Sequence, residues 1–278
     1  MERFLDLGRS IFSLALGAFG IQYLMFAHTP NSLINIPPYT VQNFSTACLA
    51  GIGFLVAALS FVSRRKGRLC ALLLGAALLL NFLIFHAARI LSNMQSGNIR
   101  TRGFETLAMA GTAFVLAATF PAQRFASRAG AFVGILAQVG RFLVVVALAI
   151  LGMQHVMYHD FIASLIPAWM PARLFLAYFT GCGFLAAALS IGIGKVTRLA
   201  SALLATMFLI WVFTLHGPRV AHALHSGNEW SSMLVALCMS GMALIMGRPF
   251  VQKHWIAMRS DRNIEWNRRP EKRASVVG

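Results

Sequence analysis

Histidine and arginine are the side chains best placed to do chemistry in this sequence. The motif His86-x-x-Arg89 returns later in the chain as His216-x-x-Arg219. A spacing of three puts both side chains on one face of a helix. Ionisable groups in apolar segments are candidates for function, because burying them in a membrane is costly. Two interpretations stay open: a polar pocket for a quinone or similar head group, or arginines that reach lipid head groups beside hydrogen-bonded histidines.

A second polar cluster runs from Gln154 to Asp160. His155 and His159 are four residues apart and share a helical face, and Asp160 follows them, so the cluster has the spacing of a metal site. Histidines on facing helices also serve as axial ligands of haem, although the sequence contains no CxxCH motif. Metal and haem are therefore alternatives to the quinone pocket.

The composition is that of a membrane protein. Of 278 residues, 58% are hydrophobic and 12% are charged, whereas charged residues make up about a quarter of a soluble domain. A membrane helix needs about 20 apolar residues. The sequence predicts eight transmembrane helices in an all-α fold and leaves no room for a soluble catalytic domain, so we expect no independent enzymatic activity. The predicted spans are 10–27, 42–62, 69–88, 104–120, 141–158, 172–193, 199–216 and 230–247.

The basic residues predict the orientation of these helices. The formal charge is +16, and most lysines and arginines fall in the termini and in alternate loops. Because basic loops stay in the cytoplasm, both termini are expected there, and no nucleic-acid partner is implied. Every histidine except His254 then maps to the outer half of the protein. The arginines predicted to lie on that outer side are Arg89, Arg100, Arg102, Arg173 and Arg219.

An internal duplication organises the chain. The segment from Gly51 to Ser60 recurs almost unchanged from Gly181 to Ser190, and the match extends in both directions. The expected domains are two four-helix repeats, 1–125 and 126–247, and a basic cytoplasmic tail, 248–278. A unit with an even number of helices inserts the same way up each time, so the repeats should be parallel, related by a pseudo-two-fold axis along the membrane normal.

Several common signatures do not appear. There is no Ser-His-Asp order, glycine-rich phosphate loop or pair of intramembrane carboxylates, so hydrolase, nucleotide-binding and proton-pump functions lack support. Glu105 and Glu229 are predicted at the outer starts of the fourth and eighth helices, where a carboxylate complements the helix dipole.

Three motifs of the second half resemble the DoxX-like family of small four-helix membrane proteins, and the first half matches more loosely. The resemblance implies a helical bundle in a bacterial inner membrane, and some relatives are linked to membrane redox chemistry. Tyr23 stands in the first half where the pattern has a histidine. The matching residues are Gly152, Gln154, His155, Ile166, Pro167, Trp169, Pro171, Leu215, His216, Pro218 and Arg219, with Gln22, Ile36, Pro37, Pro38, His86 and Arg89 as partial echoes.

The sequence thus favours a non-catalytic membrane subunit or accessory of a redox system. Its outward-facing pocket would hold a quinone or similar lipid-soluble partner, with haem or a metal as weaker alternatives and redox-protein subunits and membrane lipid as partners. A small-molecule or metal permease and a purely structural anchor remain as rival functions. The predicted cofactor-binding residues are His86, Arg89, Gln154, His155, His216, Arg219, Gln22 and Trp169, and the predicted metal ligands are His155, His159 and Asp160.

Overall fold

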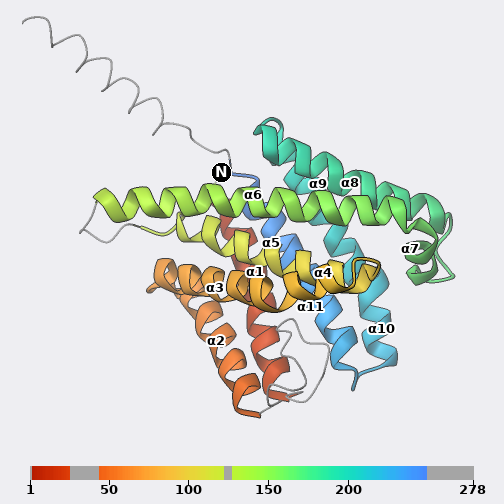
Figure 1. The fold of residues 1–278 in the computed structure, drawn as a ribbon, viewed down its shortest axis with the longest axis horizontal. Helices are drawn as coiled ribbons and strands as arrows, with labels where there is room; N and C mark the ends of the chain where they lie inside the picture. The colour runs from red at the N-terminus through yellow and green to blue at the C-terminus, as the bar shows by residue number, and fades with distance from the viewer. Residues whose placement is uncertain (1, 26–43, 122–126, 249–278) are drawn as a thin grey trace, which may run out of the picture. The chain divides into compact units, whose positions relative to one another are not determined.

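A computed structural model describes residues 2–25, 44–121 and 127–248, and these segments contain helices and turns but no strand. The first outer loop with His28 and Tyr39, and the tail with His254, lie outside the described residues. Figure 1 shows the arrangement of the helices. In chain order they are α1 (Glu2–Met25), α2 (Phe44–Ser63), α3 (Gly67–Asn81), the π-helix η1 (Phe82–His86), α4 (Ala87–Ser92), α5 (Gly97–Ala117), α6 (Ser127–Met157), α7 (His159–Leu165), α8 (Arg173–Ile193), α9 (Thr197–Trp211), the π-helix η2 (Val212–His216), α10 (Gly217–His222) and α11 (Gly227–Met246).

Six helices of the described segments are long and apolar enough to cross a membrane, so the chain has the character of a multi-pass membrane protein. The prediction of eight spans is only partly met. In α2 the apolar stretch is shorter, Ala47–Ser63, and α5 carries Arg100, Arg102 and Glu105 in its first half. The six spans are Glu2–Met25, Gly67–Ser92, Gly130–Met157, Arg173–Ile193, Thr197–His222 and Gly227–Met246.

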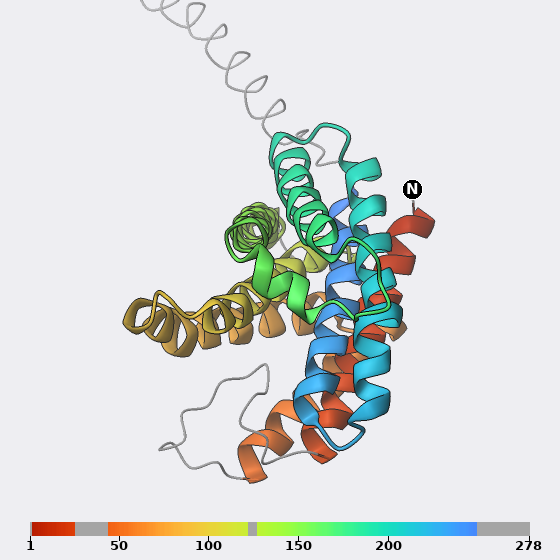
Figure 2. The same cartoon turned by 90° about the vertical axis from the view of Figure 1, so that its right-hand side faces the viewer.

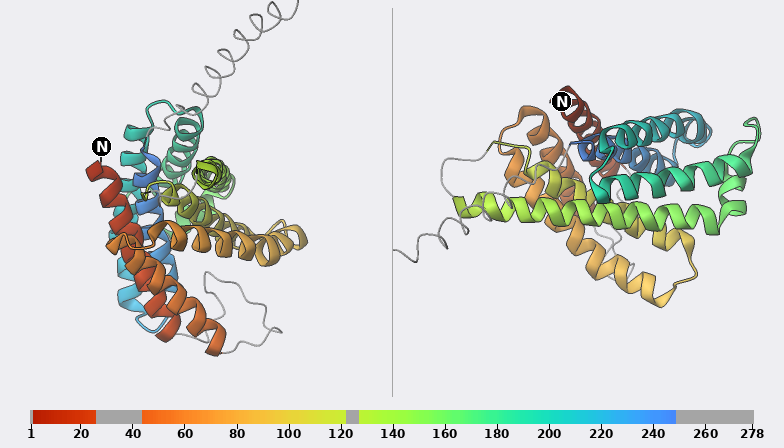
Figure 3. Two further views of the ribbon diagram at one scale, coloured as in Figure 1. Left: turned by 90° about the vertical axis from the view of Figure 1, so that its left-hand side faces the viewer. Right: turned by 90° about the horizontal axis from the view of Figure 1, so that it is seen from above.

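The long helices pack on one another in chain order, and the last of them packs on the first. Each of α1, α2, α3, α5, α6, α8, α9 and α11 packs on the next, and α11 returns to pack on α1. Figure 2 shows α11, in blue, beside the red α1 and the cyan α9 and α10. The long helix α6 lies against both α5 and α8, as the view from above in Figure 3 shows. Because α5 and α11 also contact each other, they are the innermost pair.

Close glycine contacts hold four of these helix pairs together. A Cβ atom on Gly20 of α1 would lie 2.8 Å from the carbonyl oxygen of Gly51 in α2, and one on Gly152 of α6 would lie 2.9 Å from that of Gly181 in α8. The pairs α1–α11 and α5–α6 meet in the same way at Gly8–Gly241 and Gly111–Gly140. Small residues allow this approach, and in lipid such packing replaces the hydrophobic drive for association.

Local backbone features recur at the offset of the sequence repeat. Each of the π-helices η1 and η2 ends at a motif histidine, His86 or His216. Lys66 and Val196, which precede α3 and α9, both adopt the left-handed conformation. π-Helices are frequent at functional sites, which directs attention to the two histidines.

The outward faces of the long helices are apolar. Large hydrophobic side chains such as Leu14, Leu59, Phe142 and Phe213 are more than half exposed, which suits helices surrounded by lipid tails. Many buried residues lie on α5 and α11, where small residues alternate with larger ones such as Met109, Phe114 and Met239.

Candidate functional site

A cavity of about 650 Å³ lies among α5, α6, α8, the α9–η2 segment and α11. Most of its wall comes from the second sequence repeat, and α5 closes the remaining side. The wall is largely apolar, with Leu151, Phe184, Phe208, Leu215, Val235 and Met239 among the residues that form it.

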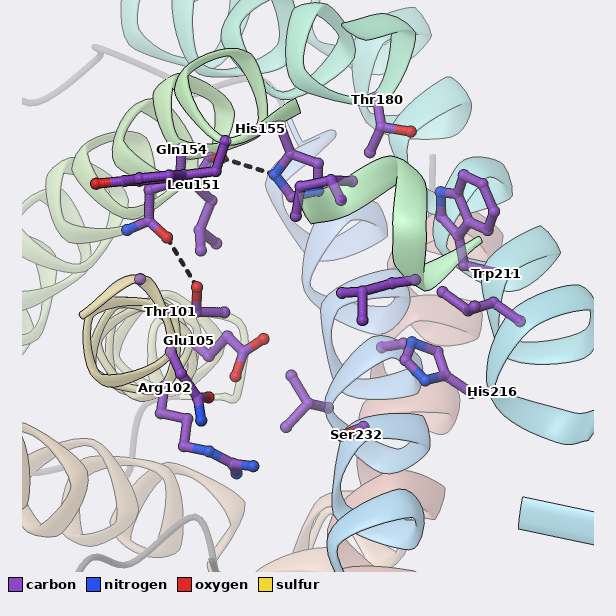
Figure 4. A pocket seen from close by; sticks show the side chains of 18 of the residues that line it. Thr101, Arg102, Glu105, Leu151, Gln154, His155, Thr180, Trp211, His216 and Ser232 are labelled. Carbon is purple, nitrogen blue, oxygen red and sulfur yellow. Dashed lines mark hydrogen bonds between the residues drawn. The ribbon is translucent and has the colours of Figure 1, made fainter. Parts of the chain in front are cut away.

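Polar side chains reach this cavity from several helices. Gln154 and His155 come from the end of α6, Thr180 comes from α8, and His216 ends η2. The fold therefore brings polar residues that lie far apart in the chain to one cavity. Figure 4 shows Glu105 on the α5 side of the cavity and His216 on the η2 side.

Two side-chain contacts hold α5 against the end of α6. The Thr101 hydroxyl donates a hydrogen bond of 2.7 Å to Oε1 of Gln154 (Figure 4). Arg100 donates a hydrogen bond of 2.5 Å to the Tyr158 hydroxyl, and its guanidinium carbon lies 5.2 Å from the centre of the Tyr158 ring. These contacts fix the wall that carries Glu105.

Three buried polar atoms of the cavity wall have no hydrogen-bond partner among the described residues: Nε2 of Gln154, Oγ1 of Thr180 and Nδ1 of His216. Gln154 is 6% exposed and Thr180 is 4% exposed. Buried polar groups in native proteins are nearly always hydrogen-bonded. Three such atoms around the same cavity therefore indicate that a polar partner is missing from it.

Arg219 is held at the edge of this site by Glu229. Its Nε atom lies 3.0 Å from one carboxylate oxygen of Glu229, and Nη2 donates a hydrogen bond of 3.2 Å to the other. The helical conformation continues from the π-helix η2 through Gly217 and Pro218 into α10.

Four predicted site residues lie away from the cavity. His86 is 1% exposed and stacks on Phe82 with ring centres 6.5 Å apart, and Arg89 is exposed. Trp169 is 65% exposed. Gln22 donates hydrogen bonds of 2.6 Å to the Gly227 carbonyl and 2.7 Å to the Ser231 hydroxyl, so it joins α1 to α11. Four of the residues predicted to bind a cofactor do line the cavity: Gln154, His155, His216 and Arg219.

The predicted metal ligands do not converge. Tyr158 leaves the helical conformation between α6 and α7, so His155 and His159 are not successive turns of one helix. Each Nδ1 is engaged by a main-chain carbonyl, Leu151 at 2.8 Å for His155 and Val156 at 3.0 Å for His159. Asp160 is 88% exposed. Within the described segments, no group of three histidine, cysteine or acidic side chains could hold a metal ion. Haem stays a prediction.

Glu105 is the cavity residue that the sequence assigned to another role. It was expected to complement the dipole at the start of its helix, but α5 begins at Gly97 with Ser96 as its N-cap. Glu105 thus lies two turns inside the helix, about 12 Å from its start. The sequence did contain a sign of this position: Glu105 follows Thr101 by four residues, so both side chains lie on one face of α5. Glu229 does occupy the first turn of α11, as expected.

The fold and the cavity together define a class: a multi-pass helical membrane protein with an internal, partly polar cavity. The comparisons do not narrow this class to a family. No family model matches the chain, and neither a curated protein nor a solved structure matches it.

Proposed function

We propose that the cavity binds a quinone or a similar lipid-soluble molecule with a polar head, and that the protein serves a redox system as a membrane subunit or accessory without catalysis of its own. The observation that carries the proposal is the set of atoms on Gln154, Thr180 and His216 that have no hydrogen-bond partner among the described residues, in a wall that is largely apolar. Sites for small molecules combine apolar walls with a few convergent polar groups, and their volumes run from about 300 to 1,000 Å³.

The surroundings of the cavity favour a ligand that comes from the bilayer. Phe184 and Phe208 offer flat apolar surfaces, and their ring centres are 5.4 Å apart. Outside the cavity, the helices expose large hydrophobic side chains such as Phe179 and Ile210. These exposed apolar side chains suit contact with lipid tails, the phase in which a lipid-soluble ligand dissolves.

The proposal includes the arrangement of the chain in the membrane. We infer eight membrane helices in two parallel repeats, in a bacterial inner membrane with both termini in the cytoplasm. The recurring π-helices, the recurring glycine contacts and the basic loops support this arrangement. The resemblance to DoxX-like proteins, and with it the link to redox partners, belongs to the same proposal.

Tryptophan fluorescence tests the binding, because Trp211 lines the cavity and quinones quench nearby indole rings. The purified protein in lipid nanodiscs is titrated with a short-chain ubiquinone. We expect saturable quenching that His216→Leu weakens at least about tenfold, the loss of roughly 1.4 kcal/mol. His225→Leu is the matched control, since His225 is exposed and does not line the cavity.

Two results would count against binding in this cavity. Quenching that rises linearly with quinone concentration would indicate simple partition into the lipid. Equal affinities for the wild type and His216→Leu would remove the cavity as the binding site. A Trp211→Phe variant identifies the reporting indole and should lose most of the saturable signal.

A further inference from the structure

We infer that Met239 determines which ligands fit the cavity: the polar head binds at one end, the apolar part points to a closed floor at the other end, and Met239 on that floor limits its length. This inference rests on the proposed function and specifies the shape of the molecule that the site accepts. It follows from the order of polar and apolar residues along the lining helices and from the packing beyond the cavity.

The lining helices share one end, which we call the outer end of the cavity. There α6 and α10 end, and α5, α8 and α11 begin. Arg100 of α5 donates to the hydroxyl of Tyr158, directly after α6, and Arg102 of α5 donates to the side chain of Asn228 in the first turn of α11. The position of a lining residue along its helix therefore shows how far it lies from the outer end.

Polar lining residues lie nearer the outer end than apolar ones in four of these helices. On α11, Asn228 and Ser232 come before Met239, and on α8, Thr180 comes before Phe184. The ends of α6 and of the α9–η2–α10 segment follow the same order, with Leu151 deeper than Gln154 and His155, and Phe208, Trp211 and Leu215 deeper than His216 and Arg219. A ligand with one polar head therefore pairs its polar atoms only when its apolar part points inward.

The inner end of the cavity is closed within the described segments. Met239 is the deepest lining residue of α11, and Met242, one turn further, is fully buried and does not line the cavity. Phe208 is the deepest lining residue of α9, and Leu204 and Ala205 beyond it are buried in the same way. The other three helices repeat this closure, with Ala147 and Leu148 beyond Leu151, Ala187 and Ala188 beyond Phe184, and Ala108 and Met109 beyond Glu105.

A hydrogen bond fixes this floor. The Ser240 hydroxyl of α11 donates a bond of 3.1 Å to the carbonyl oxygen of Ala205 in α9, next to Met239 and one turn beyond Phe208. Phe208 is also held by its ring contact with Phe184. Because packed interiors yield little to added atoms, the floor resists a ligand that is too long. The side chain of Met239 can be shortened without loss of this ring contact.

The short helix α7 offers the other place for an apolar chain. Phe161 and Leu165 of α7 line the cavity and are exposed. A chain that leaves past α7 gives up contact with Met239 and Phe208 and leaves apolar space unfilled, which forfeits dispersion energy. The inward direction keeps these contacts, so the length of the chain should matter.

The test uses ubiquinone analogues in which a straight alkyl chain of increasing length replaces the isoprenoid tail. Each analogue is titrated against the full-length protein in nanodiscs by Trp211 fluorescence, and affinities are referred to the quinone concentration in the lipid. Lipid tails are as apolar as the cavity wall, so short chains should bind alike. Once the chain reaches the floor, we expect affinity to fall at least about tenfold.

Two methionine variants locate this limit. Met239→Ala should move the loss of affinity to chains about two carbons longer, because it frees space at the floor. Met242→Ala is the matched control: it removes the same atoms one turn further along α11, outside the cavity, and should leave the limit of the wild type. If Met239→Ala does not fold, as judged by thermal unfolding, Met239→Val must show a smaller shift in the same direction.

The outcomes separate this inference from the proposed function. If affinity does not fall at any chain length, the chain leaves past α7 and the inference is overturned while the cavity keeps its function. The same limit in the wild type and in Met239→Ala would also overturn it. If no analogue binds the wild type saturably, the proposed function fails and the inference fails with it.

Discussion

The side-chain amide of Gln22 in α1 donates a hydrogen bond of 2.7 Å to the hydroxyl of Ser231 in α11, which joins the first described helix to the last. A bond of equal length connects Thr101 in α5 to Gln154 in α6. These are corresponding positions of the two sequence repeats. The first pair lies in closed packing, whereas Gln154 of the second faces the cavity.

The hydrogen bonds of Gln22 to α11 predict that removal of its side chain lowers the stability of the protein but not its affinity for quinone. In the Gln22→Ala variant, the Gly227 carbonyl and the Ser231 hydroxyl lose their donor inside the helix packing. We expect the free energy of unfolding to fall by about 1 kcal/mol, since hydrogen bonds within membranes contribute little more. Unfolding in mixed micelles measures this change, and the quinone affinity should stay that of the wild type. A tenfold loss of affinity would assign Gln22 to the binding site after all.

The close approach of α5 and α6 predicts sensitivity to a single methyl group. A Cβ atom on Gly111 would collide with the main-chain carbonyl of Gly140. We expect Gly111→Ala to lower the free energy of unfolding by about 2–3 kcal/mol through overpacking. Gly53→Ala is the matched control, because a Cβ atom there meets nothing within 4 Å. Equal stabilities of the two variants would contradict the described contact.

Filling the cavity should separate binding from stability. Ala236 of α11 lines the cavity, so the ring of Ala236→Phe would occupy the space proposed for the ligand. We expect quinone affinity to fall at least about tenfold while the thermal unfolding temperature stays equal or rises. Leu237→Phe adds a ring at the next residue of the same helix, which does not line the cavity, and should retain binding. Normal binding by Ala236→Phe would exclude this cavity as the site.

The proposed parallel arrangement of the two repeats makes a prediction about topology. With eight membrane helices, the turns at Gln95 and His225 lie on the outer side and those at Lys66 and Lys195 on the cytoplasmic side. Single cysteines at these positions are placed in a variant whose four native cysteines are replaced by serine. A membrane-impermeant maleimide should label the first pair in intact cells and the second pair only after permeabilisation. Labelling of Gln95→Cys and His225→Cys from opposite sides would rule out the parallel arrangement.

Much of the fold could be predicted because apolar length and small-residue spacing are local properties. The helices α8 and α11 lie close to their predicted ranges. The polar motifs of the second half, Gln154 with His155 and His216 with Arg219, do meet at one cavity. The repeat instead aligned His86 with His216, and these two residues do not meet at the cavity.

The first-half motif shows what the sequence could not tell. His86 matches His216 in sequence and in its π-helix, yet it is buried against Phe82. Tyr23 takes the position that corresponds to His155, and its ring packs on Phe54 with centres 5.6 Å apart. Which of two matching motifs faces a cavity depends on the volumes of side chains from other helices, and no single segment encodes that.

The most direct test of the central claim is to locate the bound ligand by photocrosslinking. A quinone that carries an azido group on its ring is irradiated with the protein in nanodiscs, and the modified peptides are identified by mass spectrometry. We expect adducts within residues 151–158 and 211–219 that disappear when excess unlabelled quinone is added. Adducts confined to outward-facing residues such as Leu14 and Leu59, and insensitive to that competition, would contradict the assignment of the cavity as a quinone site.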